Sequence, residues 1–220
     1  MESAFPREGM VGIWKPKGMS SHDAVNIVRR LSGVRRVGHA GTLDPLASGV
    51  LVMGIGREST KRLGIAVAHE KEYLALVRLG AESSTGDEEG EKTPTPNPAV
   101  PPGNAVEAAT RKFIGRILQV PPIYSALKVK GRTAYSYARA GEEVELAARE
   151  VEVKEIEVVS YAWPDISLRV VTGPGVYIRS LARDIGRELN VGGYLAALTR
   201  TRVGEYDRDT CMRIAPDTAE

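Results

Sequence analysis

The chain has 220 residues, of which 42% are hydrophobic and 26% charged, with a formal net charge of +2. This composition is that of a folded globular protein rather than a disordered one, and the length allows one large domain or two small ones. The single cysteine, Cys211, excludes an internal disulfide and a cysteine-rich metal site. The sequence has no signal-peptide pattern and no run of about 20 apolar residues, so it predicts a cytoplasmic protein that does not bind a membrane.

The charge is unevenly distributed along the chain. Residues 1–80 and 111–150 contain more Lys and Arg than Asp and Glu, whereas residues 81–110 and 151–220 contain fewer. Such a separation is expected if one face of the protein meets phosphates. Charge spread over a solvated surface explains it equally well.

The first half of the chain predicts two strands and a helix before a long loop. Ser20 precedes apolar residues at helical spacing, which predicts a capped helix that ends near Gly33. The apolar run 50–55 predicts a buried strand, and residues 72–79 predict a second strand. Residues 82–100 are acidic and rich in proline, which is typical of a loop.

The second half alternates helices and strands. Residues 104–118 predict a helix, residues 151–161 and 165–172 predict two strands, residues 176–189 predict a helix, and residues 195–206 predict a last strand region. No regular strand–helix–strand repeat is present. The interpretation is therefore a single α+β domain, residues 1–220, built around a mixed sheet.

The segment 38–61, GHAGTLDPLASGVLVMGIGRESTK, holds the strongest candidate for chemistry. Asp44 lies between a glycine-rich turn and Pro45, just before the predicted buried strand. A carboxylate in a loop braced by a strand has little conformational freedom, as catalytic groups require. Alternatively, Asp44 caps a short helical turn with Pro45 in the first helical position. These residues alone do not name a reaction.

The whole string, however, resembles the signature of the TruB-type family of tRNA pseudouridine-55 synthases. Further similar pieces follow in the order of that family, and the resemblance extends over residues 11–206. These pieces are KPKGMSS at 15–21, KEY at 71–73, PPIYSALK at 121–128, GVYIRSL at 175–181 and LTR at 198–200.

The resemblance implies both a fold and an activity. The fold is the pseudouridine synthase fold, a largely antiparallel mixed sheet flanked by helices, with a thumb-like RNA-gripping insertion at residues 121–141. The activity is the isomerisation of uridine 55 in the T-loop of tRNA to pseudouridine, without a cofactor or metal. The implied partner is the T-arm of tRNA, and we expect a monomer with no obligate protein partner. Family members usually continue into a C-terminal RNA-binding module; we expect no separate PUA-like domain here.

Three residues match the catalytic positions of the family. Asp44 matches the catalytic aspartate, Arg179 the arginine that pairs with it, and Tyr73 the tyrosine that stacks on the target base and is placed for proton handling at C5. Each has an ordinary alternative. Arg179 could belong to a solvated stripe with Arg183 and Arg187 on one helix face, and Tyr73 could be a plain strand tyrosine.

Four more residues match positions around the flipped nucleotide. His39 is expected to contact RNA or shape the pocket rather than to act as acid or base, and Lys15 to support the floor of the site. Tyr177 and Leu198 match residues that line the uracil pocket, and plain core packing is an equally good explanation for them. Trp14 departs from the family, which usually has Asp or Asn before this lysine.

The thumb-like segment mixes tyrosines with basic residues. Lys128, Lys130 and Arg132 are expected to bind phosphates, and the neighbouring tyrosines to offer faces for unstacked bases. The alternative is a solvated loop with chance tyrosines. For the whole chain, the rival functions are pseudouridine formation in another RNA, and RNA binding or tRNA folding with little catalysis. A glycosidase would need two paired carboxylates, and the motifs offer only Asp44.

Overall fold

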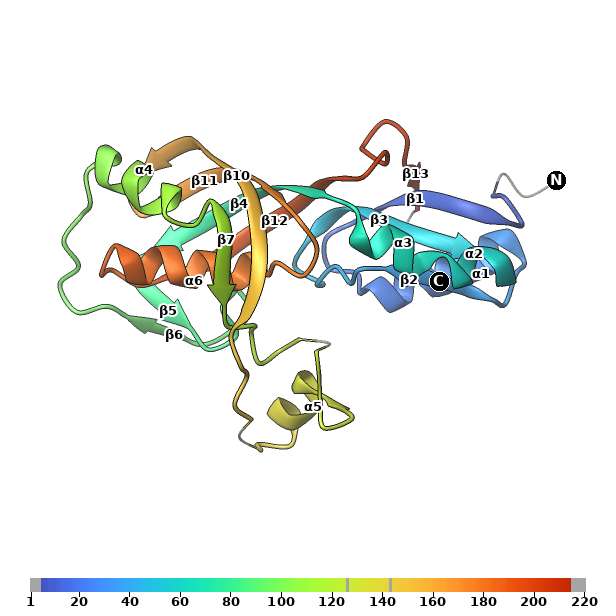
Figure 1. The fold of residues 1–220 in the computed structure, drawn as a ribbon, viewed down its shortest axis with the longest axis horizontal. Helices are drawn as coiled ribbons and strands as arrows, with labels where there is room; N and C mark the ends of the chain where they lie inside the picture. The colour runs from blue at the N-terminus through green and yellow to red at the C-terminus, as the bar shows by residue number, and fades with distance from the viewer. Residues whose placement is uncertain (1–4, 126, 143, 215–220) are drawn as a thin grey trace, which may run out of the picture. The chain divides into compact units, whose positions relative to one another are not determined.

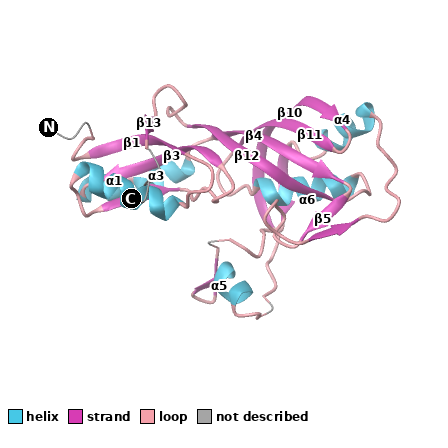
Figure 2. Ribbon diagram, turned by 180° about the vertical axis from the view of Figure 1, so that it is seen from behind, coloured by secondary structure: helices cyan, strands magenta, loops and turns pink. Residues whose placement is uncertain are grey.

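The computed structural model describes residues 5–125, 127–142 and 144–214. Its strands form a mixed, mostly antiparallel sheet with helices packed beside it, as expected for an α+β protein (Figures 1 and 2). The chain divides into two compact units. Unit 1 comprises residues 1–73 and 198–220, and unit 2 comprises residues 74–197. The expectation of a single domain stays a prediction.

Unit 1 is built around the buried strand β3 (Ser48–Ile55), which confirms the apolar run as a strand. On one edge it pairs antiparallel with β1 (Gly9–Lys15), and β1 in turn pairs with β13 (Met212–Arg213). On its other edge β3 pairs with two strands. There β2 (Val37–Ala40) pairs with the end of β3, and β12 (Gly193–Val203) pairs in parallel with Ser48 and Gly49.

Three helices belong to unit 1 among the residues described. The predicted first helix is confirmed as α1 (Ser21–Ser32). Ser20 and Asp23 form a reciprocal capping box at its start, and Gly33, with φ of 69°, ends it in the left-handed conformation. The two short helices α2 (Arg57–Lys61) and α3 (Leu63–Ala68) follow β3.

Unit 2 continues with strands in the order β12, β4, β11, β10 and β7. The predicted strands are confirmed as β4 (Lys71–Leu79), β10 (Arg149–Ala162) and β11 (Asp165–Thr172). The predicted helix near residue 180 is α6 (Ile178–Glu188), whose buried face includes Leu181, Ala182 and Ile185. Because these residues recur at helical spacing, one side of α6 packs on the core of the unit.

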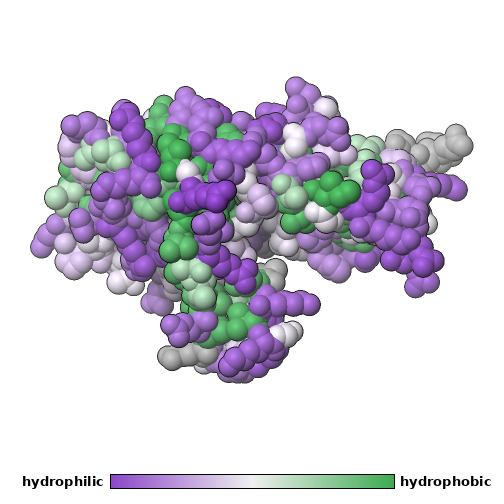
Figure 3. All heavy atoms as spheres, viewed as in Figure 1, coloured by the Kyte–Doolittle hydropathy of each residue, from purple (hydrophilic) through white to green (hydrophobic). Residues whose placement is uncertain are grey.

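The segment 121–141 stands out from the sheet of unit 2 (Figure 1). It contains the hairpin β8 (Lys128–Val129) and β9 (Arg132–Thr133), followed by α5 (Ala134–Arg139). Lys130 and Gly131 both have positive φ, as a tight hairpin turn requires. Figure 3 shows apolar residues on this segment with hydrophilic residues around them. We refer to residues 121–141 as the thumb-like segment; its residue 126 lies outside the described residues.

Two expectations from the sequence were wrong. Residues 104–118 do not form one helix: α4 (Gly103–Arg111) ends early, and β7 (Gly115–Gln119) pairs with β10. Gly115 has φ of 102°, which a helix cannot contain, and pairing with β10 outweighs the helical spacing. The segment 82–100 is not wholly a loop, because β5 (Ala81–Ser83) and β6 (Lys92–Pro94) form a short hairpin. Of the helices described, none is both long and apolar enough to cross a membrane.

The contact between β3 and β12 depends on a glycine. Gly49 has φ of 115°, and a Cβ on it would lie 2.1 Å from the carbonyl oxygen of Arg200. We therefore expect Gly49→Ala to lower the free energy of unfolding by at least about 3 kcal/mol. The matched control is Gly64→Ala, because Gly64 has open space around its Cβ position and should change stability by less than about 1 kcal/mol. Denaturant unfolding measures both, and equal stabilities would contradict the close approach.

Candidate functional site

The loop that carries Asp44 is a braced β-turn. The amide of Ala47 donates to the carbonyl of Asp44 at 3.0 Å, which places Pro45 in the second turn position, where proline is favoured. The alternative of a capped helical turn is therefore wrong. The amide of Gly18 donates to the Pro45 carbonyl at 2.8 Å and holds the turn from the segment between β1 and α1. The Asp44 side chain is half-buried.

The first residue of α1 also holds this loop. The Ser21 hydroxyl donates to the carbonyl of Leu43 at 2.8 Å and accepts from its amide at 2.9 Å. Ser21 and Leu43 are both buried. The residue just before Asp44 is thus fixed at both of its backbone polar groups, which limits how far the carboxylate can move.

Arg200 joins the two ends of the same loop. Its side chain is 2% exposed, and its Nε donates to the carbonyl of Val50 at 2.7 Å while an Nη donates to the carbonyl of Gly41 at 3.0 Å. Arg200 was part of the sequence resemblance but was not predicted as a site residue. An arginine at the end of an apolar strand, next to a tight glycine turn, was the available signal.

Two buried lysines add to this positive charge. Lys15 is fully buried, and its ammonium donates to the carbonyls of Met19 and Pro16 at 2.6 and 2.9 Å. Burial lowers the pKa of Lys15 to about 8; the charge of Asp44 opposes this shift, and that of Arg200 adds to it. Burial, with a smaller contribution from Arg200, also lowers the pKa of Lys71 to about 8. The charge of Asp44 thus acts on Lys15, and the expected place of Lys15 in the floor of the site stays a prediction.

Tyr73 lies in the same group of side chains. It is 6% exposed. Burial raises the pKa of its phenol, the charge of Arg200 and hydrogen bonding with it lower the pKa, and the charge of Asp44 raises it. The net shift is upward, so the phenol is neutral near pH 7. Within unit 1 the charges of Asp44 and Arg200 thus act on both Lys15 and Tyr73.

The other two predicted residues of unit 1 have different environments. His39 is half-buried on β2, and burial, followed by the charges of Arg200 and His22, lowers its pKa. Its Nδ1 is buried and has no hydrogen-bond partner among the described residues. Leu198 is 9% exposed, which fits either a pocket wall or the core. Their RNA contacts stay predictions.

Arg179 is not part of a solvated stripe, because it is only 7% exposed. Its guanidinium donates to the carbonyls of Tyr124 and Thr85 at 2.7 and 3.3 Å and lies 3.4 Å from a carboxylate oxygen of Asp87. All these partners belong to unit 2. The predicted pairing of Arg179 with Asp44 stays a prediction.

Asp87 is itself buried and held in place. Its carboxylate accepts from the hydroxyl of Thr85 and from the amide of Glu89. A buried carboxylate needs such donors in addition to a cation. Asp87 therefore fixes the direction of Arg179. From the sequence this segment was expected to be an acidic loop, and no role was predicted for Asp87.

A glutamine positions the start of α6, a role that no local sequence pattern predicted. Gln119 is 2% exposed at the end of β7. Its side-chain amide donates to the carbonyl of Tyr177 at 3.2 Å and accepts from the amide of Tyr177 at 2.8 Å. The Gln119 side chain therefore satisfies both backbone polar groups of Tyr177, as a neighbouring strand would. Tyr177 is half-buried, and its predicted place in a uracil pocket stays a prediction.

The three predicted phosphate-binding residues of the thumb-like segment are all exposed. Arg132 stacks on the ring of Tyr137, with the guanidinium carbon 4.2 Å from the ring centroid, and pairs with Glu142 at 3.0 Å. Lys128 and Lys130 lie on the same hairpin. Within the described ranges no three His, Cys, Asp or Glu side chains are grouped as a metal ion requires.

The charge of Arg200 should be detectable at His39. We expect Arg200→Gln to raise the pKa of His39 toward its ordinary value, because the nearby positive charge disfavours the imidazolium. Proton NMR titration can follow it, since the chain has only three histidines. His22→Gln should raise the pKa of His39 less, by the same mechanism, and it replaces the Arg200 variant as the test if that variant unfolds. Arg213→Gln, an exposed control, should leave the pKa unchanged; an unshifted His39 in both test variants would contradict the electrostatic interpretation.

Comparison with known proteins gives a consistent result. A model of the TruB family pseudouridylate synthase N-terminal domain matches residues 29–178. The tRNA pseudouridine synthase B of Thermobifida fusca is 52% identical over 207 residues, which cover 90% of this chain and 70% of that protein. The protein of the same name from Corynebacterium diphtheriae is 43% identical over 221 residues, which cover 97% and 73%.

Solved structures show the same fold. A chain in a Cbf5–Nop10–Gar1 complex is 28% identical with a TM-score of 0.72, and the match covers 97% of this chain but 57% of that one. A chain in an H/ACA RNP bound to a substrate RNA containing 2′-deoxyuridine is 26% identical with a TM-score of 0.69, over 96% and 56%. This chain thus spans little more than half the length of those two. From the matched domain and the identities to the curated relatives, the chain belongs to the TruB family of pseudouridylate synthases.

Proposed function

We propose that this chain isomerises a uridine of tRNA to pseudouridine, and that the target is uridine 55 in the T-loop. The observation that carries the proposal is the rigid Asp44 loop, with Lys15, Tyr73 and Arg200 buried around it. The names of the relatives support the reaction and the substrate. The enzyme would act in the cytoplasm as a monomer, without an obligate protein partner.

The reaction suits a single carboxylate. The bond between the ribose carbon and N1 of uracil breaks, the base turns, the same ribose carbon bonds to C5, and the C5 proton moves to N1, so that no atom or electron is gained. A carboxylate can attack ribose or the base, or remove a ribose proton, and each route remains open for Asp44. The cations Lys15 and Arg200 stabilise the negative charge that all three routes need.

Tyr73 supplies a stacking surface and a proton donor, which the Asp44 carboxylate cannot provide. Its ring gives a face for a flipped uracil, and its neutral phenol can exchange a proton with the base. Burial keeps that proton in place at neutral pH. The detached uracil would then remain stacked while it turns, which the reaction requires.

Unit 2 contributes groups for RNA binding. Lys128, Lys130 and Arg132 are exposed on one hairpin, as residues that bind phosphates must be. The ion pair of Arg132 with Glu142 is exposed, so it gives little stability and can yield to a phosphate. The carbonyl of Tyr124 joins this thumb-like segment to Arg179. RNA bound by the segment is therefore mechanically linked to the arginine that the family pairs with its aspartate.

A protein that only binds RNA would not need three buried cations near the Asp44 loop. Burying Lys15, Lys71 and Arg200 together disfavours the folded state, and such groups are concentrated at functional sites. The direct test is incubation of the purified protein with unmodified tRNA, followed by chemical mapping of pseudouridine. Pseudouridine at position 55 is the expected result; tRNA without pseudouridine would refute the proposal.

Asp44→Asn should abolish isomerisation and leave tRNA binding nearly unchanged, because asparagine keeps the shape but loses the charge. The matched control is Asp23→Asn, which changes an exposed carboxylate at the start of α1. It should lower stability by about 1 kcal/mol through the weakened cap and keep turnover. Single-turnover rates and filter binding measure both properties. Turnover of the Asp44 variant within tenfold of wild type would remove Asp44 from the mechanism.

Replacing Lys128, Lys130 and Arg132 together with Ala should weaken tRNA binding and flatten its salt dependence. If all three bind phosphates, the slope of log affinity against log salt should fall by up to about 3 units. The double substitution Arg111→Ala and Arg116→Ala is the control, since both arginines are exposed outside the thumb-like segment. An unchanged slope in the triple variant would mean that the segment is only a solvated loop.

A further inference from the structure

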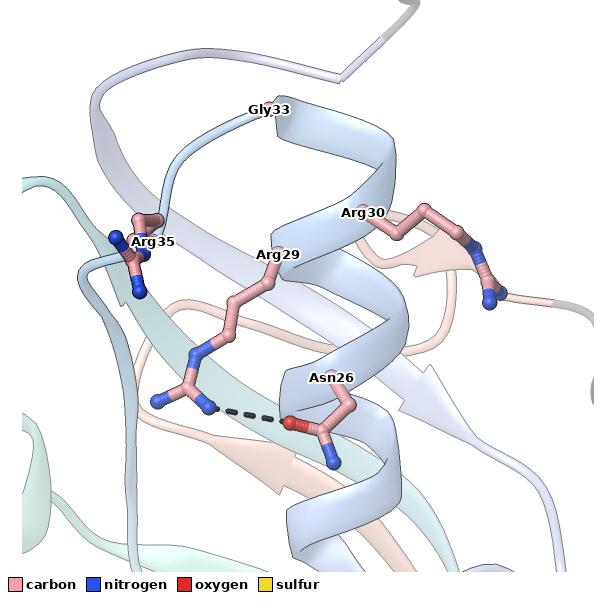
Figure 4. Close-up of a pocket in the computed structure, with 5 residues that line it drawn as sticks. All are labelled: Asn26, Arg29, Arg30, Gly33 and Arg35. Carbon is pink, nitrogen blue, oxygen red and sulfur yellow. Dashed lines mark hydrogen bonds between the residues drawn. The ribbon is translucent and has the colours of Figure 1, made fainter.

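The outer surface of α1 in unit 1 carries an arginine-rich depression (Figure 4). It is open to solvent and has a volume of about 680 Å³. Within the part of the chain that the structure describes, none of the lining residues is acidic. They are Asn26, Arg29, Arg30, Gly33 and Arg35. This depression, the α1 arginine site, was not predicted from the sequence.

The end of α1 creates this arrangement. Asn26 and Arg30 lie on the side of the helix opposite to its buried residues, and Arg29 lies between that side and the buried one. The left-handed Gly33 ends the helix and turns the chain, so that Arg35 comes back beside it. Figure 4 shows the side chains of Arg29 and Arg35 on one side of α1 and that of Arg30 on the other.

Structural roles account for only part of the cluster. Arginines in the last turn of a helix are stabilised by the helix dipole, and this applies to Arg29 and Arg30. Arg29 also donates to the carbonyl of Val37 at 3.2 Å and to the side chain of Asn26 at 3.1 Å. Arg35 lies beyond the helix, is exposed, and makes no hydrogen bond or ion pair within the described residues. Packing and helix stability give no reason for its charge.

The position of the arginines relative to Asp44 suggests a function for their charge. Ser21, the first residue of α1, is hydrogen-bonded to Leu43 beside Asp44. Arg29 and Arg30 come eight and nine residues after Ser21, so they lie about 12–14 Å along the helix axis from that loop. A strand of a nucleic acid duplex advances about 3.4 Å per nucleotide, so this length corresponds to about four nucleotides.

We propose that the α1 arginine site binds backbone phosphates in the stem next to the RNA loop that carries the target uridine. The inference rests on the proposed function. Guanidinium groups bind phosphate through paired hydrogen bonds, and the described residues of the lining include no carboxylate. Phosphate contacts fix the position of an RNA without reading its sequence. The site thus holds the stem while the loop enters the catalytic region.

The test compares salt dependence on two RNAs. The variant carries Arg30→Gln and Arg35→Gln and keeps Arg29, which supports β2. On a T-arm hairpin its slope of log affinity against log salt should fall by about 2 units, so that from 50 to 200 mM salt wild type loses about tenfold more affinity than the variant. On an oligonucleotide of the loop alone, the slopes of wild type and variant should agree.

The matched control carries Arg208→Gln and Arg213→Gln. It removes the same charge from unit 1 at two arginines that lie over the ring of Trp14, and its slope on the hairpin should equal that of wild type. If the double variant is less stable in thermal unfolding, Arg35→Gln alone should still lower the slope by about 1 unit.

Two outcomes would overturn the inference: equal slopes for wild type and variant on the hairpin, or an equal decrease for the variant and the control. Wild type that binds the hairpin with the expected slope but forms no pseudouridine in tRNA would refute the proposed function and leave the phosphate site standing. Because binding is measured apart from the reaction, the two failures are distinguishable.

Discussion

The Asp44 loop depends on the two hydrogen bonds of the Arg200 guanidinium. One reaches the carbonyl of Gly41, just before the turn, and the other reaches Val50, just after β3 begins. A planar fork can hold two backbone segments at once, and both bonds are strengthened by the charge of the donor. The loop between them then has fixed ends, and the turn at Pro45 and the contacts of Ser21 settle its interior. The backbone of the Asp44 loop is therefore fixed before any RNA arrives, as electrostatic preorganisation requires.

The same charge has an energetic consequence. Lys15, Lys71 and Arg200 are all less than a tenth exposed, and each loses hydration that a surface cation keeps. Backbone carbonyls replace much of that hydration: two accept from Lys15, two from Lys71 and two from Arg200. The charge of Asp44 favours the ammonium of Lys15, and the lowered pKa values show that burial still dominates for both lysines. Burial and the charge of Arg200 therefore disfavour the charged form of both lysines, and a nearby negative group such as Asp44 or an RNA phosphate favours it.

The sequence predicted the features that depend on neighbouring residues and missed those that depend on residues far apart along the chain. The capping box of α1, the apolar run of β3 and the Asp44 loop are local, and the local pattern gave each of them correctly. The prediction of one helix over residues 104–118 was wrong in its second half. Its apolar residues do follow helical spacing, but β7 forms there because it pairs with β10, a strand distant in the sequence. Gln119 was missed for the same reason: its partner, Tyr177, is 58 positions along the chain. For the site, the resemblance supplied Asp44, Tyr73 and Lys15, but the role of Arg200 appears only once its burial and its partners are known.

The choice between arginine and lysine at these buried positions follows from what each cation must hold. Lys15 donates to the carbonyls of Pro16 and Met19, which lie one and four residues away, so a compact ammonium on a flexible stem reaches both. Arg200 must span Gly41 and Val50, two carbonyls of different segments, both more than 100 residues distant in sequence. Arg179 likewise spans Tyr124 and Thr85 and also meets Asp87. A lysine could hold one end of each set but not the other, because its donors diverge from a single point. The two arginines are therefore the places where each unit ties a functional loop to its own framework.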